Sequence, residues 1–118
     1  MLYEVSKLIA GTVAERRKLL ADELERILKI LSGMDVIKVL AFGSFITGRT
    51  GLQSDLDLIV VMKTEERFVD RLQRIYTAIN PQVAADILVY TPEEFKEMSS
   101  KNPLIKRAVK EGKVLYES

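Results

Sequence analysis

The sequence contains neither cysteine nor histidine among its 118 residues. The missing cysteines exclude disulfide bonds, and the two absences together exclude zinc sites built from these residues. A catalytic triad or an acid–base pair that depends on histidine is excluded as well. Any metal ion must therefore be bound by oxygen atoms, which are the ligands that Mg²⁺, Mn²⁺ and Ca²⁺ prefer.

A large net charge and a long apolar run are also missing. Eighteen basic and 17 acidic residues leave a formal net charge of +1, so no bulk attraction to nucleic acid or to a membrane surface is expected. No apolar segment approaches the ~18 residues that suggest a membrane span. Glu4 and Lys7 interrupt the N-terminus where a signal peptide would need an apolar run. The sequence therefore favours a cytoplasmic protein that does not bind membranes.

The chain does contain an alternation of helical and strand patterns. Apolar residues make up 47% and charged residues 30%, which is typical of a single globular domain of this length. The predicted helices cover residues 2–31, Thr64–Asn80, a short segment from Pro92, and Pro103–Glu111. The predicted strands cover Val36–Gly43, Asp55–Met62, Gln82–Tyr90 and residues 113–117. We expect an α/β (α+β) domain with a small mixed sheet, whose first two strands are antiparallel and whose helices pack against it.

Local signals indicate where several of these helices begin and which faces they bury. Thr64 is the predicted N-cap of the second helix, and Pro81 follows its end. Thr91 and Pro92 form a typical N-cap and first helical residue for the third. The buried stripe of the second helix is predicted to contain Phe68, Val69, Leu72, Ile75, Tyr76 and Ile79.

Two aspartates, Asp55 and Asp57, stand at the beginning of an apolar strand. Residues two apart in a strand project from the same face, so these carboxylates repel each other unless water screens them or a cation lies between them. Asp86 is a third acid within the apolar strand VAADILV, where a buried and unpaired carboxylate would be costly. If the two strands are neighbours, the three aspartates form a site for a hard metal ion.

Gly43 and Ser44 end the strand that precedes these aspartates. Glycine allows the backbone to approach a ligand closely, and the following N–H groups and the Ser44 hydroxyl are suited to phosphate oxygens. Asp55 and Asp57 alone are equally well explained as exposed residues at a strand end. Their combination with Gly43, Ser44 and Asp86 favours a site for a metal-bound nucleotide.

The stretch GSFITGRTGLQSDLDL resembles the signature of the DNA polymerase β-like nucleotidyltransferase superfamily: Gly43-Ser44, ten intervening residues, then Asp55-x-Asp57. Asp86 stands where that family carries its third carboxylate. The motif resemblance covers about residues 36–90, and the tail is similar to the end of the minimal nucleotidyltransferases (MNT). It implies a single minimal nucleotidyltransferase domain over 1–118, with an N-terminal helix (1–33), a catalytic core (36–90), and C-terminal helices with a short strand (91–118).

The resemblance also implies the roles of the motif residues. Gly43 and Ser44 would bind the triphosphate of ATP or another nucleoside triphosphate. Asp55, Asp57 and Asp86 would bind two Mg²⁺ ions and act as the catalytic residues. A hydroxyl would attack the α-phosphorus and pyrophosphate would leave, a reaction that depends more on positioning and charge neutralisation than on covalent chemistry.

Basic residues are a further source of phosphate contacts. Many minimal nucleotidyltransferases have an arginine directly before the loop glycine, where this chain has Thr47; Arg49 lies two residues further on and is a candidate substitute. The cluster of Lys106, Arg107 and Lys110 is interpreted as the solvated face of a helix rather than as an RNA contact.

Finally, the resemblance implies a partner. Minimal nucleotidyltransferases similar to this chain pair with HEPN-domain proteins, presumed ribonuclease toxins, and act as antitoxins that transfer AMP to a tyrosine of the toxin. Two alternatives stay open: a non-catalytic antitoxin or binding module with the same fold, and a transferase for small molecules such as aminoglycosides, in which a homo-oligomer completes the pocket.

Overall fold

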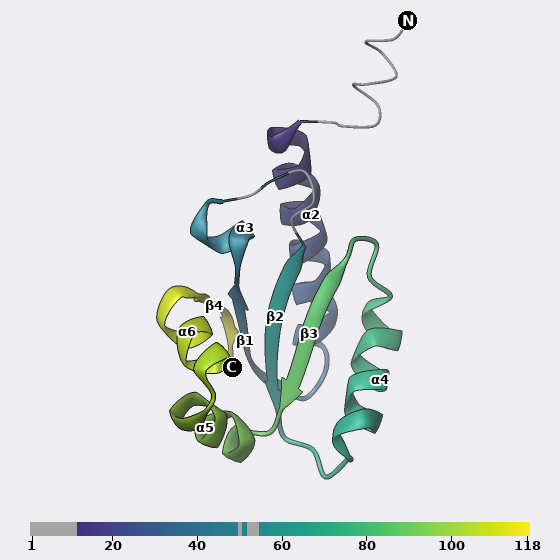
Figure 1. Cartoon of the computed structure of the whole chain (residues 1–118). Helices are drawn as coiled ribbons and strands as arrows, with labels where there is room; N and C mark the ends of the chain where they lie inside the picture. The colour runs from purple at the N-terminus through teal and green to yellow at the C-terminus, as the bar shows by residue number, and fades with distance from the viewer. Residues whose placement is uncertain (1–11, 50, 52–54) are drawn as a thin grey trace, which may run out of the picture.

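The computed structural model describes residues 12–49, 51 and 55–118 (Figure 1). Its helices are α2 (Val13–Ser32), α3 (Ser44–Thr47), α4 (Phe68–Ile79), α5 (Pro92–Lys101) and α6 (Pro103–Glu111). Its strands are β1 (Val36–Phe42), β2 (Leu56–Met62), β3 (Ala85–Tyr90) and β4 (Lys113–Glu117). The predicted α/β class is confirmed. Among the described residues, none of the helices combines the length and the apolar character needed to cross a lipid bilayer.

The four strands form one mixed sheet in the order β3-β2-β1-β4. β1 pairs antiparallel with β2, as predicted, and also with β4. β2 and β3 run parallel, because α4 carries the chain back to the end of the sheet at which β2 began. This parallel pairing makes Asp57 and Asp86 direct neighbours.

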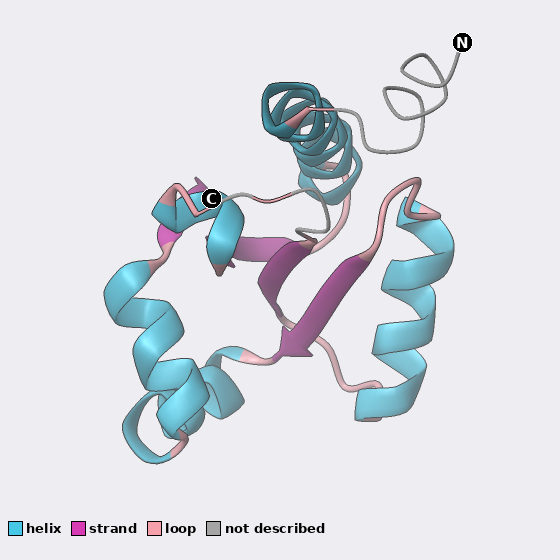
Figure 2. Ribbon diagram, turned by 45° about the horizontal axis from the view of Figure 1, so that its top comes forward, coloured by secondary structure: helices cyan, strands magenta, loops and turns pink. Residues whose placement is uncertain are grey.

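Helices cover both faces of this sheet (Figure 2). α2 and α4 pack on one face, and α5 and α6 pack on the other. Along β2 the side chains alternate, so that Leu56 and Leu58 enter the core under α2 and α4 while Ile59 faces α6. Asp57 therefore projects from the face that α5 and α6 partly cover.

The structure corrects several predicted helix features. Thr12 is extended and caps α2 by accepting a hydrogen bond from the Glu15 N–H, so the helix predicted over 2–31 does not pass through Thr12; the part before it lies outside the described residues. α4 begins at Phe68 rather than Thr64, whose hydroxyl instead accepts the Glu66 N–H within a turn. The exposed fraction of Val69 is 69% and that of Phe68 is 39%, so neither residue belongs to the buried stripe.

The start of β3 differs from its prediction for a related reason. The strand begins at Ala85 instead of Gln82. The backbone N–H of Gln82 donates to the buried Glu23 carboxylate of α2, so this donor is already used by a helix and does not join the sheet.

An ion pair connects α4 to α5. The Arg71 side chain is almost fully buried and donates two hydrogen bonds to the Glu94 carboxylate. The same carboxylate accepts the Thr91 N–H and completes the capping box at the start of α5. The hydrogen bond from Arg71 is the main cause that lowers the pKa of Glu94 from 4.5 to about 2.

Acidification should remove the stabilisation that this ion pair provides. Because the pKa of Glu94 is lower in the folded chain, the contribution is complete above about pH 4.5 and is lost as the pH falls toward about 2. Glu94→Gln should lower the free energy of unfolding at pH 7 by about 2 kcal/mol, the scale of hydrogen bonds to charged groups. It should also flatten the loss below pH 4.5. Urea denaturation at several pH values measures both effects, and an unchanged pH dependence in the variant would contradict the assignment.

Candidate active site

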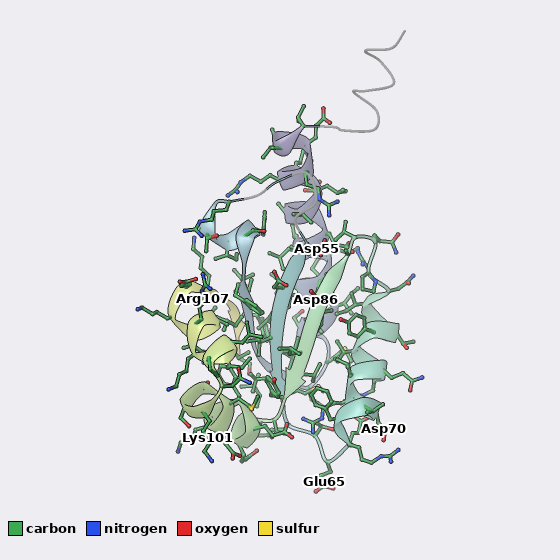
Figure 3. The ribbon with its side chains drawn as sticks, in the orientation of Figure 1. Asp55, Glu65, Asp70, Asp86, Lys101 and Arg107 are labelled. Atoms are coloured by element: carbon green, nitrogen blue, oxygen red, sulfur yellow. The ribbon has the colours of Figure 1, made fainter. Side chains whose placement is uncertain are left out.

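Asp57 and Asp86 lie side by side where the parallel strands β2 and β3 begin. Each is the second residue of its strand. Asp57 is half-buried, whereas Asp86 is exposed because β3 is an edge strand. Because Asp86 is exposed, its carboxylate does not incur the free-energy cost that a buried and unpaired carboxylate would have. Figure 3 shows Asp55 and Asp86 at the same end of the sheet, so the structure brings the three predicted aspartates together.

The three carboxylates act on one another electrostatically. Burial raises the pKa of Asp57, and the negative charges of Asp86 and Asp55 raise it further. Asp57 is thus the central member of the cluster, and its ionised form is disfavoured by its surroundings. A cation placed among the three side chains would relieve this repulsion.

Gly43 determines how closely the backbone approaches Asp57. Its φ of +83° lies in a region that side chains strongly disfavour. A Cβ atom added at Gly43 would lie 2.2 Å from Oδ2 of Asp57. Glycine is therefore required both by the backbone conformation and by the carboxylate beside it, which ties the Gly43-Ser44 turn directly to the acidic cluster.

The donor atoms present fit a hard divalent cation. All three aspartates offer oxygen ligands only, which suits Mg²⁺. The space beside Asp57 is kept open by the missing side chain at Gly43. Within residues 12–49, 51 and 55–118, no group of three or more acidic side chains converges closely enough to enclose an ion. The three aspartates therefore lie near one another and offer suitable oxygen ligands, but their side chains do not converge around a single position.

Two arginines of α2 approach the site, and the sequence analysis missed both. The Arg16 guanidinium lies 3.9 Å from Oδ1 of Asp55. The Arg17 guanidinium lies 5.4 Å from the ring centroid of Phe45, the residue after Ser44. In the sequence the two arginines belong to a run of charged residues within the first helix, and no motif marks the pair. Only the packing of α2 on one face of the sheet brings them to the site.

A cleft of about 260 Å³ opens between α3 and α6, and we call it the α3–α6 cleft. Its lining residues are Phe42, Gly43, Ser44, Thr47, Arg49, Leu104, Arg107, Ala108 and Glu111. One wall thus contains the predicted phosphate-binding turn together with Arg49, the candidate substitute for the arginine missing at position 47. The other wall is the C-terminal helix. Its Arg107, assigned from the sequence to a solvated face, is largely exposed but borders this cleft.

Comparison with known proteins decides the family. Residues 22–116 match the model of the nucleotidyltransferase domain family. The chain belongs to this family. The matched region contains the three aspartates, the Gly43-Ser44 turn and both walls of the α3–α6 cleft.

Solved structures of low sequence identity share the fold. A Sulfolobus solfataricus protein provisionally classed as a nucleotidyltransferase has a TM-score of 0.65 and 20% identity, covering 89% of this chain and 86% of its own. A toxin–antitoxin complex with AMP-PNP gives a TM-score of 0.56 and 21% identity, over 80% of this chain and 73% of that one. A mutant of the toxin–antitoxin MntA-HpeT gives a TM-score of 0.53 and 21% identity, over 80% of this chain and 72% of that one. A search of curated protein sequences finds no match.

Proposed function

We propose that this chain is a Mg²⁺-dependent nucleotidyltransferase that transfers AMP from ATP to a hydroxyl group. The observation that carries the proposal is the pairing of Asp57 with Asp86 on adjacent strands. Asp55 is close enough to raise the pKa of Asp57, and Gly43 is packed against the carboxylate of Asp57. Membership of the nucleotidyltransferase domain family supports the reaction class.

In this reaction each part of the site has a distinct role. When bound, two Mg²⁺ ions held by Asp55, Asp57 and Asp86 would neutralise the triphosphate charge and lower the pKa of the attacking hydroxyl. Gly43 and Ser44 bind the triphosphate and align it. The acceptor oxygen attacks the α-phosphorus, the bond from this phosphorus to the oxygen bridging to the β-phosphate breaks, and pyrophosphate leaves. Asp86 receives the proton of the hydroxyl.

We further propose that the acceptor is a tyrosine of a HEPN-domain toxin, which makes this chain the antitoxin of a cytoplasmic pair. Asp86 is exposed on an edge strand, so a hydroxyl carried by another protein can approach it from solvent. Two structures that share the fold are toxin–antitoxin complexes, one of them with AMP-PNP. The resemblance of the motif and of the C-terminal tail to minimal nucleotidyltransferases points in the same direction.

Incubation of this chain with its cognate HEPN-domain protein, Mg²⁺ and labelled ATP tests the proposal. We expect the partner to become labelled from ATP that carries the label at the α-phosphate, and not from γ-labelled ATP, because the nucleotidyl group is transferred and pyrophosphate leaves. EDTA should abolish the labelling. Mass spectrometry should locate the added AMP on a tyrosine of the partner.

Two results would reject the proposal and identify an alternative. If the chain binds the HEPN-domain protein but transfers no label, it is a non-catalytic antitoxin. If it releases pyrophosphate with small hydroxyl compounds such as aminoglycosides and labels no protein, it is a small-molecule transferase.

A further inference from the structure

The α3–α6 cleft lies directly beside the three aspartates of the site. Gly43 is packed against the Asp57 carboxylate and also lines the cleft. On the proposed function, the α-phosphorus of ATP lies beside Asp57 and the triphosphate lies along Gly43 and Ser44. The β- and γ-phosphates then extend from the aspartates into this cleft, so its second wall must accommodate their negative charge.

The second wall of the cleft is one edge of α6, and the position of this helix is determined by its packing and by its N-cap. Ile105 and Ala108 are buried against β1 and β2, which determines the rotation of the helix about its axis. Asn102 caps the helix with hydrogen bonds to two backbone N–H groups. With these positions settled, Arg107 and Glu111, one turn apart, both border the cleft. Figure 3 places Arg107 on the part of α6 below α3.

We propose that Arg107 binds the terminal phosphates of the nucleotide from across the cleft, opposite Ser44, and that Glu111 opposes this binding. Nε of Arg107 donates to Oε2 of Glu111 at 3.2 Å, so the carboxylate competes with phosphate for the guanidinium. The inference rests on the proposed function and adds a helix outside the sequence motif to the nucleotide site.

Charge and size both favour the phosphate end of the nucleotide as the occupant. Among the described residues that line the cleft, Arg49 and Arg107 supply two positive charges against the single carboxylate of Glu111. Guanidinium groups bind phosphate oxygens through paired N–H donors. The volume of about 260 Å³ lies below the ~300–1,000 Å³ of pockets that enclose a whole small-molecule ligand. The cleft thus suits a polyphosphate tail better than a complete nucleotide.

Calorimetric titrations with three probes test this assignment: Mg·ATP, Mg·tripolyphosphate and AMP. Arg107→Ala should weaken the binding of Mg·ATP and of Mg·tripolyphosphate by about tenfold, the scale of a charge-assisted hydrogen bond. It should leave the affinity for AMP unchanged, because AMP lacks the phosphates that Arg107 contacts. Glu111→Gln should tighten Mg·ATP binding by about threefold, because a competing negative charge is removed and an exposed charge pair has an effect of this size. Opposite effects of two residues of one ion pair are not expected if the pair is only structural.

Lys106→Ala is the matched control, since it removes the same charge from the same helix at a position that does not line the cleft. Its affinities should equal those of the wild type, and thermal unfolding should confirm that every variant folds. Equal Mg·ATP binding by wild type and Arg107→Ala, or equal losses for ATP and AMP, overturns this inference alone. A wild type that binds neither Mg·ATP nor Mg·tripolyphosphate overturns the proposed function together with it.

Discussion

Asp57→Asn should abolish nucleotidyl transfer and at the same time stabilise the protein in EDTA. The transfer rate should fall at least about a thousandfold, because a lost metal ligand removes several kcal/mol of charge stabilisation from the transition state. The free energy of unfolding should rise by about 1 kcal/mol, typical of a functional site relieved of an unfavourable charge. Burial and the charges of Asp86 and Asp55 all disfavour the ionised form of Asp57. Asparagine has nearly the same shape as aspartate but carries no charge. Labelled transfer assays and urea denaturation in EDTA measure the two effects.

Asp70→Asn is the control for this variant. It makes the same chemical change on α4, well away from Asp55 and Asp86 (Figure 3), where Asp70 forms an exposed ion pair with Arg67. Transfer should be unchanged, and stability should fall by less than about 1 kcal/mol. If Asp57→Asn keeps a rate within tenfold of the wild type, Asp57 is not a catalytic ligand. If it destabilises the protein in EDTA, the proposed repulsion among the carboxylates is wrong.

Gly43→Ala should damage both the fold and the reaction. The new Cβ would meet the Asp57 carboxylate, and the backbone conformation at φ +83° and ψ −165° is one that alanine strongly disfavours. We expect a loss of about 1–3 kcal/mol in the free energy of unfolding. The transfer rate should fall about a hundredfold, because a displacement of ~1 Å in a catalytic group has effects of that size. Both quantities can be measured on one preparation by denaturation and labelled transfer.

Gly48→Ala separates backbone strain from the collision with Asp57. Gly48 also has a positive φ, of +80°, but among the described residues other than its two chain neighbours no atom lies within 4 Å of an added Cβ. This control should cost about 1 kcal/mol of stability and change the transfer rate only a few-fold. If Gly43→Ala loses no more activity than Gly48→Ala, the contact between Gly43 and Asp57 has no catalytic importance.

Much of the fold was predictable because local chemistry determines it. The Thr91-Pro92 start of α5 and the Asn102-Pro103 start of α6 follow from hydrogen bonding and backbone restraint within a few residues. β1 and β2 were predicted to within one residue of their observed bounds because their apolar runs have no competing local pattern. The Gly43-Ser44 turn and the three aspartates were identifiable from residue type and spacing alone.

The errors occurred where a distant contact overrides the local pattern. The predicted strand from Gln82 is shortened because the Gln82 N–H is bound by Glu23, 59 positions earlier in the chain. Phe68 and Val69 fit a helical apolar stripe, but they lie at the exposed start of α4. The apolar pattern around Asp86 did not show whether its carboxylate is buried, and it is exposed because β3 lies at the edge of the sheet. Sheet order and helix docking decide these outcomes, and neither is encoded in local periodicity.

The sequence by itself determined the chemistry that is available. Without cysteine or histidine, only oxygen ligands can hold a metal ion, and the motif spacing already indicates the nucleotidyltransferase family to which the chain belongs. The tertiary structure alone decided which other residues stand beside that motif. Arg16 lies near Asp55, and Arg107 lies across a cleft from Ser44. These neighbours are more than 35 positions apart and come together only because apolar faces of α2 and α6 pack on opposite sides of one sheet.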